Sequence, residues 1–140
     1  MTDTPEQVAL EYFRRWNAGD FEGLCELFAE DMVWCIKGRF PQAGEYPREM
    51  IAGMLKLIPR FDVVEPFLLH VTNMVADNRC AAVEFTSTLK FRDGREYLND
   101  YHFLLFVENG KITRGHEYLC TYTATFNGIG EDFARVAVGA

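Results

Sequence analysis

The second half of the chain limits the possible folds most strongly, because from Val63 onward it consists of long segments with the pattern of β-strands. These segments span about 67–75, 80–91, 96–107 and 111–125. Turns are expected between them at Asp77-Asn78, Asp93-Gly94 and Asn109-Gly110. The last two of these pairs are among the strongest short signals for a β-hairpin. This half of the chain therefore predicts an antiparallel meander.

The first half of the chain has the periodicity of helices instead. Thr4, Pro5 and Gln7 form a helix start with Gln7 at the capping-box position, and this helix is expected to end at Ala18. The other elements expected here are a short helix over about 20–28, a buried strand over 32–36, a loop over 37–46 and a third helix over 47–58. Helices followed by strands predict the α+β class, with the helices packed on one face of a curved sheet.

A chain of 140 residues, of which 49% are hydrophobic, has the size and composition of one globular domain. We therefore expect a single domain over 1–140, with its core at about 5–125. The last residues, 126–140, are small and mixed in character and are expected to form a loose C-terminal tail.

The net charge of −7 argues against nucleic acid and anionic membranes as partners, since no basic run is long enough to follow a phosphate backbone. The N-terminal residues are acidic and polar, unlike a signal peptide, and no apolar segment approaches the roughly 20 residues that span a bilayer. We therefore expect a cytoplasmic location.

The sequence indicates neither a cofactor nor a metal. No G-x-G-x-x-G or Walker pattern occurs, and neither His70 nor His116 has a partner at metal-ligand spacing. The cysteines are widely separated and form no C-x-x-C pair; they are Cys25, Cys35, Cys80 and Cys120. We expect reduced core thiols, with a disulfide pair or a metal site as the alternatives.

The two segments 80–91 and 96–107 carry apolar residues on both faces. Their odd positions are mostly apolar, while the even positions include Asp100 and then turn apolar at Leu104 and Phe106. Three helices alone cannot cover both faces. One face is therefore expected to pack on another subunit, or the even face to line a cavity that holds a few polar groups.

Turn geometry sets the expected register of these strands. A two-residue turn at Asn109-Gly110 pairs Glu108 with Lys111, and a three-residue loop with Gly94 in the left-handed conformation fixes the preceding hairpin. A slip by one residue in either hairpin would turn the affected side chains to the other face.

This register places Glu84, His102 and Glu117 in a row across three adjacent strands. Partial burial raises the pKa of a glutamate towards neutrality, and histidine titrates in the same range. Such a wall can therefore transfer protons. The alternative is a charged ladder that faces solvent.

Several segments resemble a known family. They are Tyr12 to Asp20 with Leu27 to Asp31, the positions Gly38, Ala43-Gly44 and Arg48-Glu49, and Phe106 to Ile112 followed by Glu117-Tyr118. Over roughly residues 5–125 the chain is similar to the nuclear transport factor 2-like superfamily, in its SnoaL-like branch of polyketide cyclases and ketosteroid-isomerase-like proteins. The resemblance implies a cone-shaped α+β barrel, in which three N-terminal helices pack in a strongly curved, mainly antiparallel sheet around a deep apolar pocket. It also implies a homodimer that packs sheet against sheet, through the odd apolar face.

The resemblance assigns roles to individual residues. Tyr12 matches the tyrosine that donates a hydrogen bond to the oxyanion in ketosteroid isomerases, and His102 falls where those enzymes carry a protonated Asp. Their catalytic base would fall at Ile36, which argues against steroid isomerisation by that mechanism.

Glu117 matches an essential carboxylate of two relatives, the limonene epoxide hydrolases and the phenazine-biosynthesis A/B proteins. The hydrolases also need an Arg on the strand where this chain has Ala82 and Glu84, so their triad is incomplete. Cys120 replaces an acid that is sometimes given a catalytic role in SnoaL-like proteins, which weakens a cyclase assignment.

These observations lead to the hypothesis of a cofactor-independent acid–base enzyme for a small, mostly apolar metabolite such as a polyketide, terpenoid or aromatic intermediate. Its chemistry would be of the isomerase, cyclase, hydrolase or dehydratase type. Glu117 would move a proton, His102 would orient or share it, and Tyr12 would donate to an oxyanion, with Glu84 on the same wall. The side chains expected to line the pocket are Trp16, Trp34, Ile36, Leu55, Asp100, Leu104 and Leu119. The alternative is a non-catalytic module that binds a small ligand or dimerises.

Overall fold

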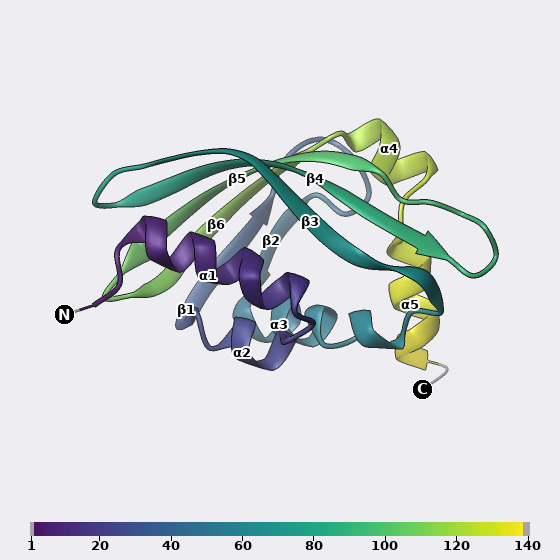
Figure 1. The fold of residues 1–140 in the computed structure, drawn as a ribbon, viewed down its shortest axis with the longest axis horizontal. Helices are drawn as coiled ribbons and strands as arrows, with labels where there is room; N and C mark the ends of the chain where they lie inside the picture. Colours follow the sequence, from purple (N-terminus) through teal and green to yellow (C-terminus); the bar gives the residue numbers. More distant parts are fainter. Residues whose placement is uncertain (1, 139–140) are drawn as a thin grey trace.

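A computed structural model of the protein describes residues 2–138 and has the α+β architecture expected from the sequence. The elements in chain order are α1 (Pro5–Asn17), α2 (Phe21–Cys25), β1 (Phe28–Ile36), β2 (Gly44–Pro47), α3 (Arg48–Leu55), the 3-10 helix η1 (Ile58–Arg60), β3 (Val63–Ala76), β4 (Cys80–Phe91), β5 (Asn99–Glu108), β6 (Lys111–Leu119), α4 (Thr121–Phe126) and α5 (Gly130–Val138). The strands form a curved sheet, and α1 lies across its concave face (Figure 1).

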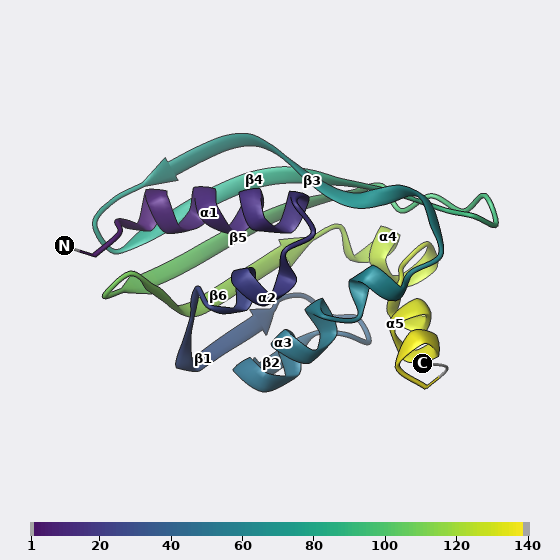
Figure 2. The ribbon, with the colours of Figure 1, turned by 60° about the horizontal axis from the view of Figure 1, so that its bottom comes forward.

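The sheet has six strands in the order β2-β1-β6-β5-β4-β3. β1 pairs with β6 in parallel, and the other neighbouring strands pair antiparallel. Since β2 and β3 are the two edges, the sheet stays open as a cone and does not close into a barrel. The helices α2 and α3 lie on the same side as α1, and α4 and α5 lie at one end of the sheet (Figure 2).

Helix α1 begins as the sequence predicts and buries its apolar stripe. The side chain of Thr4 accepts a hydrogen bond from the Gln7 amide at 3.3 Å, and the Gln7 side chain accepts one from the Thr4 amide at 2.9 Å. The buried residues of the helix include Tyr12, Phe13 and Trp16. Burial of each such side chain stabilises a fold by about 1.5–3 kcal/mol, so this stripe holds α1 on the sheet.

Both hairpin turns form as predicted. Gly94 has a φ of 95°, and Phe91 donates to the Arg95 carbonyl at 2.8 Å across a three-residue loop. Asn109 and Gly110 both have positive φ, as a two-residue turn of the primed type requires.

The predicted row of three side chains is nevertheless wrong. Glu84 pairs with His102 as expected, but the β5–β6 register shifts between Phe106 and Val107, so that His102 lies opposite Tyr118. A bulge places one additional residue in β6, and such a residue turns every later side chain to the other face. Glu117 therefore lies opposite Phe103.

The two sheet faces are also the reverse of what the sequence suggested. The odd-numbered residues of β4 and β5, among them Val83, Phe85 and Phe103, are buried in the core. The even-numbered residues, including Glu84 and His102, form the convex outer face. The homodimer expected through the outer face stays a prediction, and it concerns the even-numbered residues.

The C-terminal region is not a loose tail. Residues 121–126 form α4, although the β-type pattern extended the last strand to 125, and residues 130–138 form α5. Phe133 of α5 packs edge-to-face on Phe61 at 4.9 Å between ring centroids. Residues 139–140 of the predicted tail lie outside the described residues.

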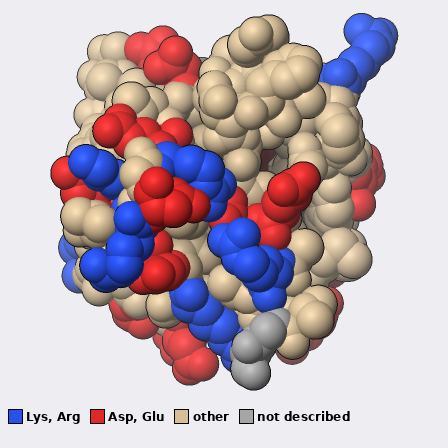
Figure 3. All heavy atoms as spheres, turned by 90° about the vertical axis from the view of Figure 1, so that its right-hand side faces the viewer, with Lys and Arg blue, Asp and Glu red and all other residues tan. Residues whose placement is uncertain are grey.

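A buried carboxylate anchors α5. Asp132 is 1% exposed and accepts two hydrogen bonds from Arg95, at 2.8 and 3.2 Å, and a further one from Arg135. Burial alone would raise the pKa of Asp132, but the hydrogen bonds from the two arginines outweigh it and lower that pKa. Basic and acidic side chains interleave on this end of the molecule (Figure 3).

Smaller differences concern the first strands and the cysteines. β1 begins four residues earlier than expected, at Phe28, and the predicted loop contains the start of β2. All four cysteines are free thiols, but only Cys25 and Cys35 are buried, and Cys120 is exposed at the start of α4. Of the helices described, none has the length and apolar character needed to cross a membrane.

Candidate functional site

The concave face of the sheet and the helices enclose a cavity of about 180 Å³. Its walls are mainly aromatic and aliphatic, and they come from both halves of the chain. The lining residues are Tyr12, Trp16, Trp34, Ile36, Phe40, Gln42, Tyr46, Ile51, Met54, Leu55, Ile58, Phe67, Leu69, Phe85, Tyr97, Tyr101, Phe103, Glu117, Leu119, Ala124, Gly128, Ile129, Gly130 and Phe133.

Glu117 supplies the carboxylate of this cavity. The residue projects from β6, and its surface is accessible only in part. Its Oε1 accepts a hydrogen bond from Trp34 Nε1 at 2.8 Å. Burial raises the pKa of Glu117 to about 7, although the Trp34 hydrogen bond acts in the opposite direction. Near neutral pH this carboxyl group therefore exists in both protonation states, which suits an acid–base catalyst.

A glycine lets Trp34 reach Glu117. Trp34 on β1 pairs with Gly115 on β6, two residues before the glutamate. A Cβ atom at Gly115 would lie 2.2 Å from the Trp34 ring. The indole therefore lies directly over a position that tolerates no side chain, and this close approach orients the N–H group towards the carboxylate.

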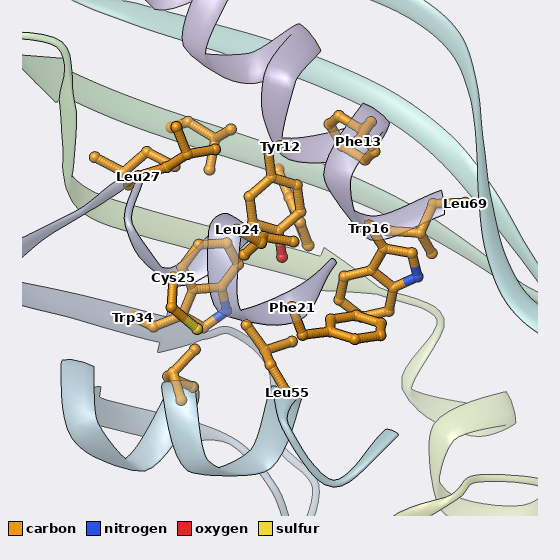
Figure 4. Packing of buried hydrophobic residues seen from close by; sticks show 14 of the residues in the cluster. Tyr12, Phe13, Trp16, Phe21, Leu24, Cys25, Leu27, Trp34, Leu55 and Leu69 are labelled. Atoms are coloured by element: carbon orange, nitrogen blue, oxygen red, sulfur yellow. The ribbon is translucent and has the colours of Figure 1, made fainter. Parts of the chain in front are cut away.

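Tyr12 projects from α1 between the indoles of Trp16 and Trp34 (Figure 4). Its ring stacks on Trp34 with 6.2 Å between centroids and 8° between the planes. Burial, and next the charge of Glu117, raise the pKa of Tyr12 well above its usual value, so the hydroxyl keeps its proton. Among residues 2–138 no side chain or carbonyl accepts a hydrogen bond from it, which leaves the O–H free to donate to a bound molecule.

Comparison with known families identifies the scaffold. The model of the SnoaL-like domain matches residues 9–115, which is most of the chain. The chain belongs to the SnoaL-like domain family. The search of curated proteins finds no match to this SnoaL-like protein.

Solved structures share the fold of this SnoaL-like protein. An NTF2-like protein from Burkholderia xenovorans is 26% identical, with a TM-score of 0.64 and coverage of 88% of this chain and 94% of the other. IdmH from Streptomyces antibioticus, a candidate polyketide cyclase, is 19% identical, with a TM-score of 0.70 and coverage of 86% and 95%. An LEH-like epoxide hydrolase from M. tuberculosis is 16% identical, with a TM-score of 0.68 and coverage of 96% and 95%.

The structure divides the residues that the sequence singled out into two groups. Those that line the cavity are Tyr12, Trp16, Trp34, Ile36, Leu55, Glu117 and Leu119. Those outside the cavity lining, on even positions of β4 and β5, are Glu84, Asp100, His102 and Leu104. Glu84 is exposed, where its Oε1 accepts a hydrogen bond from Asn73 Nδ2 at 2.7 Å. Neither Glu84 nor His102 reaches Glu117, because the bulge in β6 turned the glutamate inward.

Sequence reasoning missed two tyrosines of the cavity, Tyr97 and Tyr101. Their hydroxyl groups are hydrogen-bonded to each other, and Asn99 Nδ2 donates to the Tyr97 hydroxyl at 2.9 Å. The signal was present, since both residues belong to the odd apolar face. That face was expected to form a subunit contact, so its two phenols were not expected in the cavity.

Among the residues that the structure describes, no lysine, arginine or histidine lines the cavity. The residues that the structure describes include no group of three or more His, Cys, Asp or Glu side chains placed to hold a metal ion. The polar groups at the cavity wall are therefore one carboxyl group, phenolic hydroxyls, indole N–H groups and the Gln42 amide.

Proposed function

We propose that this SnoaL-like protein is an acid–base enzyme that acts on a small, neutral and mostly apolar metabolite, with Glu117 as the group that moves the proton. The observation that carries the proposal is a carboxyl group in the wall of a mostly apolar cavity, where burial raises its pKa to about 7. Catalytic groups work best when their pKa lies near the working pH, and burial is a common way to bring a glutamate there.

The neighbouring strand supports this role. In the ketosteroid isomerases the base would fall at Ile36, and here Ile36 lines the cavity but cannot accept a proton. Glu117 is the direct partner of Ile36 in the parallel ladder between β1 and β6. A carboxylate is thus present one strand away from the position of that base.

Tyr12 would stabilise the negative charge that forms on the substrate. When Glu117 removes a proton next to a carbonyl, the electron pair of the broken C–H bond moves to the carbonyl oxygen and gives an enolate. The free O–H of Tyr12 can donate to that oxygen, and a donor already in place costs no reorganisation during the reaction. Protonation of the enolate by the Glu117 carboxyl group completes the cycle.

The cavity also favours neutral molecules. A substrate carboxylate or phosphate would enter a site with one acidic side chain and no basic side chain in its lining. Desolvation of such an anion without a partner is costly. A flat aromatic or polycyclic molecule, by contrast, can make van der Waals contacts with the aromatic side chains of the lining.

The proposal is tested by hydrogen exchange in a simple ketone. 1-Indanone is neutral and apolar, and the loss of its α-proton signal in D₂O can be followed by NMR. The wild type should accelerate this exchange above the rate in buffer. Glu117→Gln should lower the protein-catalysed rate by at least about a hundredfold, and Tyr12→Phe by roughly ten- to a hundredfold.

The residues on the convex face provide matched controls. Glu84→Gln and His102→Gln remove groups outside the cavity and should leave the exchange rate within about twofold of the wild type. If the wild type binds 1-indanone but does not accelerate exchange, the cavity is a binding site and the enzymatic proposal is wrong.

A further inference from the structure

The cavity holds a second polar group that the proposed mechanism does not use. Tyr97 and Tyr101 both line the cavity, and their hydroxyl groups are hydrogen-bonded to each other. Asn99 lies behind this pair and is 5% exposed. The three side chains form a chain of hydrogen bonds that ends at the cavity.

The orientation of the Asn99 amide follows from two backbone groups. The Asn99 side chain ends in two atoms, one oxygen and one nitrogen. The Asp100 backbone N–H points at one of them at 2.8 Å, and the Cys120 carbonyl oxygen lies 3.2 Å from the other. An N–H group needs an acceptor and a carbonyl needs a donor, so the first atom is Oδ1 and the second is Nδ2. Nδ2 is also the atom 2.9 Å from the Tyr97 hydroxyl. That hydroxyl therefore accepts a hydrogen bond from Asn99.

A count of hydrogens then leaves one donor free. Tyr97 and Tyr101 have two hydroxyl hydrogens, and their mutual hydrogen bond uses one of them. No other acceptor for either hydroxyl occurs among the residues that the structure describes. Whichever tyrosine donates to its partner, one O–H group stays available.

The free O–H group is that of Tyr101 when Tyr97 donates the hydrogen of their shared bond, and Tyr101 is the more accessible of the two residues. Tyr97 is 2% exposed, whereas Tyr101 is only half-buried and lies at the cavity wall, stacked on Phe85 at 5.0 Å. Burial is the main cause that raises the pKa of both tyrosines, so neither ionises near neutral pH.

The free donor lies on the same wall as the proton-transfer group. Glu117 is opposite Phe103 and Leu119 is opposite Tyr101, so Glu117 and Tyr101 are diagonal neighbours on one face of the sheet. Such neighbours are about 7–8 Å apart. This is a suitable distance for two groups that hold different atoms of one small molecule.

We propose that Tyr101, held by Tyr97 and Asn99, is a second hydrogen-bond donor that binds an acceptor oxygen of the substrate, such as a carbonyl oxygen. The inference rests on the proposed function for its substrate, and it narrows the substrate class to neutral molecules that carry such an oxygen. Tyr97 and Asn99 are positioning residues, because they act only through Tyr101.

The experiment compares two probes that differ by one oxygen, 1-indanone and indane. Their dissociation constants are measured by NMR titration in the Tyr12→Phe variant, so that Tyr12 cannot act as the donor. Adding Tyr101→Phe should weaken binding of the ketone relative to indane by about tenfold, which corresponds to about 1.4 kcal/mol. Adding Tyr97→Phe should produce a smaller decrease, since Tyr101 keeps its O–H but loses its support.

Tyr46→Phe is the matched control. Tyr46 also lines the cavity, but it donates its hydroxyl hydrogen to the Gln42 carbonyl at 2.6 Å and has none left for a ligand. The Tyr46→Phe substitution should therefore leave the ketone-to-indane ratio unchanged. The infrared carbonyl stretch of bound 1-indanone gives a second readout, and it should move to higher wavenumber in the Tyr101→Phe protein.

The outcomes separate this inference from the proposed function. A ketone-to-indane ratio that is unchanged in folded Tyr101→Phe protein overturns the inference, while the Glu117 exchange result still stands. Conversely, if Glu117→Gln leaves exchange unaffected, the proposed chemistry is wrong, and the ketone-to-indane ratio still tests the Tyr101 donor because no turnover is needed.

Discussion

The carboxyl group of Glu117 is subject to two opposing effects. Loss of water contact disfavours its charged form, and the hydrogen bond from Trp34 favours that form. The first effect is larger, so the pKa rises, but only to about 7. Trp34 therefore sets how much of the carboxylate exists at neutral pH.

Replacing Trp34 by Phe should raise the pKa of Glu117 further, by roughly one unit, because a hydrogen bond to a charged group is worth about 1.5 kcal/mol or more. The carboxyl carbon of Glu117 can be titrated by ¹³C NMR, and the pH at which exchange reaches half its maximum should move upward with it. Trp16→Phe is the control, since Trp16 donates to the Phe67 carbonyl and not to Glu117. Equal titration midpoints in both variants would contradict this role of Trp34.

Single residues were predicted well where helical periodicity sufficed and poorly where a bulge intervened in a strand. Tyr12 and Trp16 follow from the helical stripe of α1, and both line the cavity. His102 was placed beside Glu117 because a continuous ladder requires it. A bulge in β6 has no clear signature in the sequence, so the inward turn of Glu117 was found only in the structure.

The pairing of β1 with β6 is the element-scale contact that builds the site. Gly115→Ala would place a Cβ atom 2.2 Å from the Trp34 ring, so the indole must move. We expect a loss of about 1–3 kcal/mol in the free energy of unfolding, as for other overpacked cores, together with a higher pKa of Glu117. Urea unfolding and the NMR titration measure the two effects.

A second glycine provides the control for that substitution. Gly53 lies in α3 with nothing within 4 Å of an added Cβ atom. Gly53→Ala should stabilise the protein by about 0.5–1 kcal/mol, because alanine favours a helix. If Gly115→Ala is equally harmless, Trp34 does not depend on the close approach.

Helix α5 closes one end of the cavity and depends on its buried ion pair. Asp132→Ala leaves Arg95 and Arg135 without their shared partner, and we expect a loss of roughly 2 kcal/mol. Amide hydrogen exchange of residues 129–138 should become faster. Asp93→Ala removes an exposed partner of Arg95 and should cost less than about 1 kcal/mol. Slow exchange in both variants would mean that packing of Phe133 alone holds the helix.

Elements were predictable where local signals were strong. The α1 cap and both hairpin turns depend on residues close together in the chain, and they form as expected. The C-terminal region was misread because the alternating Thr121, Thr123 and Thr125 favour a strand by propensity. Helix α5, which follows, is held instead by Arg95, whose partner Asp132 lies 37 residues later in the chain. Long-range contacts of this kind leave little trace in a single sequence.

At the scale of the whole molecule, the aromatic content explains the cavity. Aromatic residues make up 14% of the chain. Many of them lie on the concave side, where rings from α1, β1, β4 and β5 contact each other edge-on or stacked. These large, rigid rings form most of the wall of the cavity between the sheet and the helices. The fold can therefore enclose an apolar space and still keep a single carboxyl group in its wall.

That buried carboxyl group makes the stability of the whole molecule depend on pH. The pKa of Glu117 is about 7 in the folded protein and near 4.5 in the unfolded chain, so between these values the folded state binds more protons. The part of the stability that depends on a neutral Glu117 carboxyl group is fully present below about pH 4.5 and is lost as the pH rises through about 7. By about pH 8 this shift in pKa lowers the free energy of unfolding by about 3 kcal/mol. Glu117→Gln lacks this titration, so urea unfolding should show wild type and variant nearly equal at about pH 4 and the variant more stable at about pH 8. The difference between the two proteins cancels the contributions of all other groups, and parallel pH profiles would mean that Glu117 titrates as an ordinary surface glutamate.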